Sequence, residues 1–121
     1  METLQQVRPE HLNHYGFLFG GYMLMWVDEA AWIAASLERP DCHFVTVGME
    51  KVEFRHKVEE GSILKLVVEE VKAGRTSVTY QVDVACLQTA GHEGSSEPVF
   101  SNQVTMVRVD DNGNKIPLPS K

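Results

Sequence analysis

The apolar segment at residues 20–37, GGYMLMWVDEAAWIAASL, constrains the fold more than any other stretch of this chain. Its methionine, leucine, tryptophan and alanine residues favour a helix, and Pro40 ends it. The segment has no polar side, so the helix must be enclosed rather than laid on a surface. Two adjacent acids, Asp28 and Glu29, stand in its middle and require an explanation.

Length and charge narrow the class of protein. The 121 residues predict one domain over residues 1–121, and the net charge of −6 argues against binding nucleic acid or an anionic membrane. The central acids and the short length of the apolar segment weigh against a membrane span. Two cysteines are too few for a disulfide framework, and the first ten residues do not form a signal peptide. We therefore expect a cytoplasmic protein with free thiols.

The rest of the chain reads as strands. Residues 2–8 predict a short strand that Pro9 ends, and residues 10–19 a loop. After the helix, four strands are predicted at residues 43–54, 62–72, 76–87 and 98–109, with a turn at 73–75 and a polar loop at 88–97. Connections of hairpin length favour an antiparallel sheet. We expect this sheet to curve around the helix, and a second copy to cover the helix surface that one sheet leaves open.

One spacing resembles a known family. The pattern N-x-x-G-x-x-F-G-G-x-x-x-x-x-x-D resembles the signature of hot-dog-fold acyl-CoA thioesterases, and VTVGMEKVEF with VKAGRTSVTYQVDV resembles their strands; the pattern comprises Asn13, Gly16, Phe19, Gly20, Gly21 and Asp28. The resemblance implies an α+β hot-dog fold, a curved antiparallel sheet around one long helix. It also implies hydrolysis of acyl-CoA thioesters by a homodimer or a larger assembly, such as a trimer of dimers or a tetramer. Two departures are FRHKVEEG, where relatives often carry a proline, and a shorter tail.

The start of the helix offers groups that can polarise a carbonyl. A helix N-terminus presents free N–H groups and a partial positive charge, and glycines allow a ligand to approach them. Gly20 and Gly21 are therefore candidates for this role, with Phe19 beside them as a substrate contact. The structural alternative is that the two glycines only permit tight packing of the loop against the helix.

The family pattern assigns chemistry to two further residues. It makes Asp28 the general base or nucleophile, and it takes Asp28 and Asn13 of one site from opposite subunits. Asn13 would donate from its amide to a water or carbonyl. The alternatives are a turn cap for Asn13 and an ion pair with an arginine across the dimer for Asp28. Glu29 is turned by about 100° from Asp28, so we expect a structural or interface role for it.

Coenzyme A, which is part of the substrate, carries phosphates that need cationic partners. The candidates, of which Arg75 in the AGRTS turn is favoured, are Lys51, Arg55, His56, Lys57, Lys72, Gly74, Arg75, Thr76 and Ser77. The alternative for the turn is an ordinary hairpin with an exposed arginine. We expect no separate cofactor, and no metal, because the histidine and cysteine spacing matches no zinc pattern.

Two other functions compete with hydrolysis. A non-catalytic hot-dog module could bind an acyl thioester or a small aromatic ligand. A hydratase or dehydratase of the same fold is less favoured, because that class commonly uses a histidine and residues 20–37 contain none.

Overall fold

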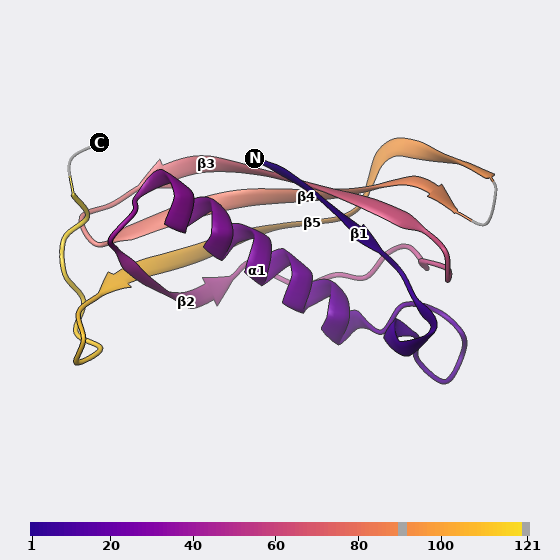
Figure 1. The fold of residues 1–121 in the computed structure, drawn as a ribbon, viewed down its shortest axis with the longest axis horizontal. Coiled ribbons are helices and arrows are strands. Elements are labelled where there is room, and N and C mark those ends of the chain that lie inside the picture. The colour runs from indigo at the N-terminus through magenta and orange to yellow at the C-terminus, as the bar shows by residue number, and fades with distance from the viewer. Residues whose placement is uncertain (90–91, 120–121) are drawn as a thin grey trace.

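A single helix lies across the concave face of a curved antiparallel sheet in the computed structural model, which describes residues 1–89 and 92–119 (Figure 1). The elements are β1 (Glu2–Gln6), the 3-10 helix η1 (Pro9–His11), α1 (Gly20–Glu38), β2 (His43–Met49), β3 (Ile63–Ala73), β4 (Ser77–Thr89) and β5 (His92–Val109). The strand order is β1-β3-β4-β5-β2, and every neighbouring pair is antiparallel. This confirms the predicted α+β hot-dog architecture.

The core lies between α1 and the sheet. Apolar residues alternate along β4, and the first four of them, Val78, Tyr80, Val82 and Val84, are fully buried, whereas Cys86 at the end of the same series is only half-buried. The helix side of the core is rich in alanine, which lets the helix axis approach the sheet closely; its buried residues are Met23, Trp26, Val27, Ala30, Ala31, Ala34 and Ala35. The sheet therefore covers one side of α1.

The opposite side of α1 stays uncovered and is partly apolar. Met25 and Trp32 are 49% and 48% exposed, and Gly21 is also exposed. At 100° per residue, Gly21, Met25, Asp28 and Trp32 fall within an arc of about 60° on the helix. We call this arc the open face of α1. An exposed apolar stripe on an otherwise buried helix is typical of an interaction surface.

β2 is shorter than the predicted strand at 43–54. Its pairing with β5 ends at Met49 opposite Val104. One residue later the buried side chain of Asn102 accepts the Glu50 N–H at 2.9 Å and donates to the Glu50 carbonyl at 3.4 Å. The Glu50 N–H also donates to the Gln103 carbonyl at 3.1 Å, and the residues that follow leave the sheet as an irregular segment.

The polar loop predicted at 88–97 is wrong. β4 continues to Thr89 and β5 begins at His92, and the two strands pair through Gln88 opposite Glu93 and Thr89 opposite His92. Residues 90 and 91 of that prediction lie outside the described residues. This hairpin extends beyond the helix (Figure 1), and its sequence shows no apolar alternation.

The carboxyl end of α1 is held by a buried ion pair. The Arg39 guanidinium is almost fully buried and donates to Glu70 of β3 at 2.8 Å. Burial alone would lower the pKa of Arg39, but the hydrogen bond and charge of Glu70 raise it, so the guanidinium stays charged. Cys42 and Cys86 are free thiols, and no helix among residues 1–89 and 92–119 could cross a membrane.

Candidate active site

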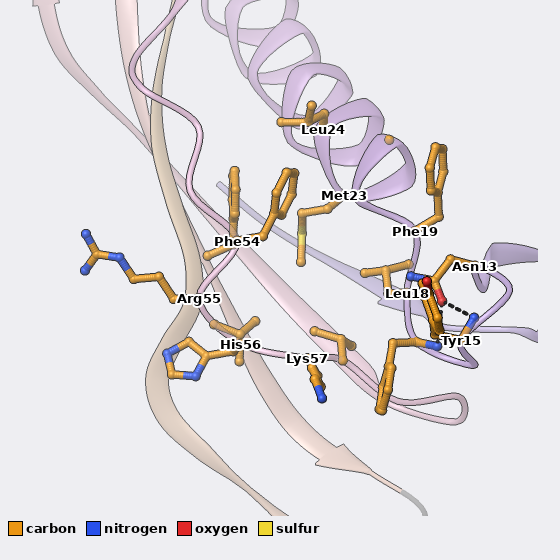
Figure 2. Close-up of a pocket in the computed structure, with 16 residues that line it drawn as sticks. Asn13, Tyr15, Leu18, Phe19, Met23, Leu24, Phe54, Arg55, His56 and Lys57 are labelled. Carbon is orange, nitrogen blue, oxygen red and sulfur yellow. Dashed lines mark hydrogen bonds between the residues drawn. The ribbon is translucent and has the colours of Figure 1, made fainter.

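A cavity of about 860 Å³ opens beside the start of α1 (Figure 2). Its walls come from the loop before the helix, the first turn of α1, the irregular segment after β2, and β5. Most of the wall is apolar; the lining residues are Asn13, Tyr15, Phe17, Leu18, Phe19, Gly20, Gly21, Met23, Leu24, Phe54, Arg55, His56, Lys57, Val58, Val99 and Phe100. A cavity of this size suits a small apolar ligand that carries a polar group at one end.

The loop before the helix is fixed by its own backbone bonds. The Leu18 N–H donates to the Val58 carbonyl, and the Phe19 N–H donates to the His11 carbonyl, each at 2.8 Å. A tight turn precedes them, in which Gly16 takes a φ of +89° and donates to the Asn13 carbonyl at 3.0 Å. Glycine adopts this left-handed conformation without strain. The turn holds Asn13 at the cavity rim.

The Asn13 side chain has a fixed orientation. Its Oδ1 accepts the backbone N–H groups of Tyr15 at 2.9 Å and Phe17 at 3.2 Å. The amide oxygen is therefore occupied, and no group in the described part of the chain accepts from Nδ2. Asn13 thus caps its turn, as the structural alternative predicted, and at the same time presents an NH2 donor at the cavity.

The first turn of α1 supplies two more donors. Phe19 is the N-cap residue, and its side chain makes no capping hydrogen bond. The Gly20 and Gly21 N–H groups come before the helical bonding pattern starts, and neither has an acceptor within the described ranges. Both residues line the cavity, so these amides are available to an oxyanion.

Asp28 is not part of this cavity. It is half-buried and faces β2, where its Oδ1 accepts the Thr46 hydroxyl at 2.5 Å. β2 carries a bulge between Thr46 and Gly48, and such bulges redirect side chains. Sequence reasoning missed Thr46, because a threonine among valines reads only as a strand former. The contact orients the carboxylate and leaves Oδ2 unused among the described groups.

One chain therefore holds two separated groups of functional atoms. Gly21 and Asp28 are seven residues apart, which is about 10 Å along the helix axis. A donor and a base that act on the same carbonyl must each lie about 3 Å from it. We call the Asn13, Gly20 and Gly21 donors the donor half-site, and Asp28 with Thr46 the acid half-site.

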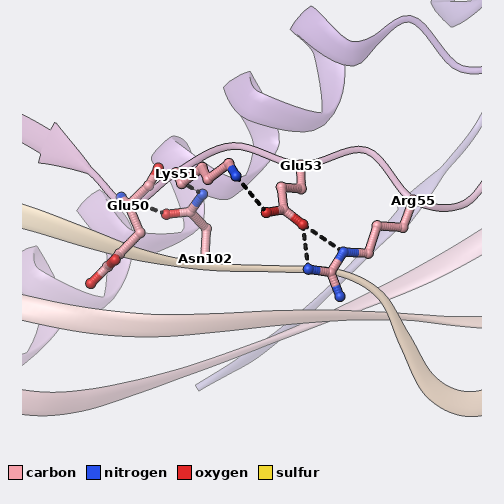
Figure 3. A network of polar contacts seen from close by, with 5 residues as sticks. All are labelled: Glu50, Lys51, Glu53, Arg55 and Asn102. Carbon is pink, nitrogen blue, oxygen red and sulfur yellow. Dashed lines mark hydrogen bonds and ion pairs between the residues drawn. The ribbon is translucent and has the colours of Figure 1, made fainter.

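Three cationic candidates lie next to the cavity. Lys57 lies 4.9 Å from the centre of the Phe17 ring and forms no ion pair within residues 1–89 and 92–119. Arg55 and Lys51 both contact the Glu53 carboxylate (Figure 3), the lysine at 3.3 Å. The Arg55 hydrogen bond, followed by that of Lys51, lowers the pKa of Glu53. Glu53 thus holds these two cations together on the outer side of the segment.

The AGRTS turn lies at the opposite end of the molecule. It joins β3 to β4 near the carboxyl end of α1, whereas the cavity opens at the amino end (Figure 1). The turn is closed by a bond from the Gly74 N–H to the Ser77 carbonyl at 2.7 Å, and Arg75 and Thr76 accept backbone bonds from Leu118 and Arg108. The structure therefore does not bring Gly74, Arg75, Thr76 or Ser77 to this chain's own cavity.

Other residues considered from the sequence have structural surroundings. His11 is buried, accepts the Arg8 N–H through Nδ1 at 3.0 Å, and lies against Tyr22 and Trp26. No group of three histidine, cysteine, aspartate or glutamate side chains suited to a metal occurs in the described ranges. Glu29 is exposed near β1, on the other side of the helix from Thr46.

Comparisons with known proteins identify the family of this chain. The model of the thioesterase superfamily matches residues 15–91, which are 77 of the 121 residues. The chain belongs to this superfamily. A curated relative from Zymomonas mobilis, an uncharacterized acyl-CoA thioester hydrolase, is 29% identical over 111 residues, which cover 92% of this chain and 72% of the relative.

Two solved structures are also similar. A hexameric hot-dog-fold thioesterase of Campylobacter jejuni has a TM-score of 0.85 and 32% identity, covering 97% of this chain and 88% of that one. An acyl-CoA hydrolase from Staphylococcus aureus, solved with butyryl coenzyme A and coenzyme A, has a TM-score of 0.84 and 26% identity, covering 99% and 71%. Structures also exist of its variants with one asparagine, or one aspartate fifteen positions later, replaced by alanine.

Two substitutions of Asn13 separate its turn-capping role from its donor role. Asn13→Ala removes the acceptor of two backbone bonds and should destabilise the fold by about 1–2 kcal/mol. Asn13→Asp keeps an acceptor in place and should stay within about 0.5 kcal/mol of the wild type. Urea unfolding measures both. Equal stability of the two variants would show that the Oδ1 bonds do not hold the loop.

Proposed function

We propose that this protein hydrolyses acyl-CoA thioesters to coenzyme A and a carboxylic acid. The observation that carries the proposal is the pair of half-sites on α1, one with free N–H donors beside an apolar cavity and one with an oriented carboxylate. Coenzyme A is part of the substrate, and the reaction needs no separate cofactor. We further propose that residues 1–121 act as a single domain in the cytoplasm.

The chemistry follows from the groups in the two half-sites. The thioester carbonyl oxygen accepts from the Asn13 NH2 and from a glycine N–H at the start of α1, which stabilises the negative charge that develops there. Asp28, oriented by Thr46, either activates a water molecule that attacks the carbonyl carbon, or attacks that carbon itself to form a mixed anhydride that water then hydrolyses to the carboxylic acid. The C–S bond then breaks, the CoA thiolate leaves, and the apolar cavity holds the acyl chain.

A two-fold dimer would unite the half-sites. If a two-fold axis passes close to Met25 on the open face of α1, residue 21 of one chain lies opposite residue 28 of the other. The donor half-site of each subunit then meets the acid half-site of its partner, which gives two sites per dimer. The same axis places Trp32 opposite residues 17–19 of the second chain. The exposed Met25 and Trp32 supply the apolar contact that such an interface needs.

The spacing in a relative supports the same pair of residues. In the Staphylococcus aureus hydrolase, the substituted asparagine and aspartate are fifteen positions apart. Asn13 and Asp28 are separated by the same number of positions in this chain (28 − 13 = 15). The Campylobacter jejuni relative is hexameric, and we infer that the dimers of this protein can assemble further, for example as a trimer of dimers or a tetramer.

The cations beside the cavity suit the phosphates of coenzyme A. Lys57 and Arg55 line the cavity, and Lys51 lines the smaller adjoining pocket, to which Arg55 also contributes. Arg75 and the turn of Gly74, Thr76 and Ser77 are too remote within one chain, so they can serve only a site of another subunit. We assign the primary phosphate contact to Lys57, because no carboxylate in the described part of the chain competes for it.

Asp28→Asn tests the proposed reaction. The amide keeps the shape of the side chain but is not a base, so kcat for an acyl-CoA panel should fall by about 100-fold or more. Release of free CoA, detected with a thiol reagent, measures turnover. Glu29→Gln is the matched control, because it removes the neighbouring acid outside both half-sites and should leave kcat unchanged. Wild-type protein that binds acyl-CoA without releasing CoA would instead be the non-catalytic module.

Lys57→Gln tests the phosphate contact. The loss of one charge should raise KM for an acyl-CoA by about tenfold and leave kcat unchanged. An acyl thioester of N-acetylcysteamine, which lacks the phosphates, should show the same KM with both proteins. Lys65→Gln serves as the charge-matched control, since Lys65 pairs with Glu2 at 3.6 Å on the far edge of the sheet. An equal rise in KM for both substrates would contradict this assignment.

A further inference from the structure

We propose that Phe54 determines which acyl-chain lengths this enzyme accepts, because its ring lies against the first residue of α1 inside the apolar cavity. This inference rests on the proposed function and adds a residue outside the motif. Phe54 lies in the irregular segment that follows β2, and it lines the cavity together with the first turn of α1.

The ring is in contact with the backbone that would hold the carbonyl. A Cβ placed on Gly20 would lie 2.8 Å from Phe54 Cζ and 3.1 Å from Cε2. The edge of the Phe54 ring therefore lies directly against the first residue of α1. Met23 and Leu24 line the same cavity (Figure 2), so an acyl chain whose carbonyl sits at the Gly20 and Gly21 amides would pack against this ring.

The ring is supported from behind. It stacks on Phe100 with a centroid distance of 5.5 Å and an interplanar angle of 27°. Phe100 belongs to β5 and is only 3% exposed, so it is fixed in the core. The Phe54 ring cannot retreat in that direction without unpacking β5. Phe100 therefore fixes one side of the ring, while 54% of the Phe54 surface stays exposed and open to a ligand.

The extended segment also separates the two ends of the substrate. Phe54 lines the main cavity, whereas Lys51 and Glu53 line a smaller adjoining pocket of about 300 Å³ on the other side. Only the residues at the junction, among them Arg55 and Phe100, contribute to both. An apolar side chain thus points toward the acyl chain, and the neighbouring charged side chains face the polar surface. Substitution of Phe54 should change acyl selectivity and leave the contacts to coenzyme A in place.

The test is a chain-length profile of two opposite substitutions. Phe54→Ala enlarges the space beside the amides and should raise the ratio of kcat/KM for longer over shorter acyl-CoAs by about tenfold or more, since one methylene in an apolar pocket is worth about 10–200-fold. Phe54→Trp should move the ratio the other way. Val52→Ala, in the same segment but outside both cavities, is the matched control and should keep the wild-type profile.

Binding of non-hydrolysable analogues separates this inference from the proposed reaction. S-alkyl-CoA thioethers of graded length carry no cleavable carbonyl, and calorimetry should give the same length order for the Phe54 variants as the kinetic profile. Length preference that stays unchanged in Phe54→Ala and Phe54→Trp, or that shifts equally in Val52→Ala, would overturn the role of Phe54. If the wild type hydrolysed no acyl-CoA but its binding of thioethers still changed with substitution of Phe54, the proposed role of Phe54 would be supported. The proposed thioester hydrolysis would then be refuted.

Discussion

Helix α1 is apolar on two opposite faces, but the single sheet of one chain covers only one of them. Its alanine-rich side packs into the concave sheet, which satisfies the hydrophobic driving force within one chain. On the open face Met25 and Trp32 stay about half exposed to solvent. A second copy packed on this face would remove their apolar surface from water. The same arc carries Gly21 and Asp28. The surface that promotes association is therefore also the surface that carries the functional groups.

This arrangement explains how an acid can stand in the middle of an apolar helix. Asp28 is not enclosed in the core, because it lies at the border between the open face and β2, where Thr46 donates to it. The donors of Asn13 and the first helical turn lie about 10 Å away along the helix. In the proposed reaction neither group completes a thioester site alone, and an antiparallel pairing of two helices would bring them together without rearranging either chain.

The sequence predicted the architecture well because its strongest signals were long and periodic. The apolar segment at residues 20–37 predicted the bounds of α1 to within one residue. The alternation of apolar residues in β4 identified the buried face of that strand. The predicted end of β2 was wrong, because the strand stops where the Asn102 side chain bonds to Glu50. The predicted start of β5 was also wrong, because its first residues pair with β4 in a hairpin whose sequence has no apolar alternation. Thr46 and Phe54 lie in a stretch that resembles the family's strands, but the sequence did not single them out, since their contacts appear only in the structure. The roles of Asn13 and Asp28 rested on the resemblance.

The most direct test of a site shared between two chains is a subunit-mixing experiment. Asn13→Asp keeps the loop acceptors but removes the NH2 donor, and Asp28→Asn removes the base. Each variant alone should be inactive. Random exchange makes half of the dimers hybrids, each with one intact site, so mixing should restore up to about a quarter of wild-type activity. Differently tagged subunits show that hybrids form. Hybrid dimers as inactive as either variant alone would contradict a site built from both chains.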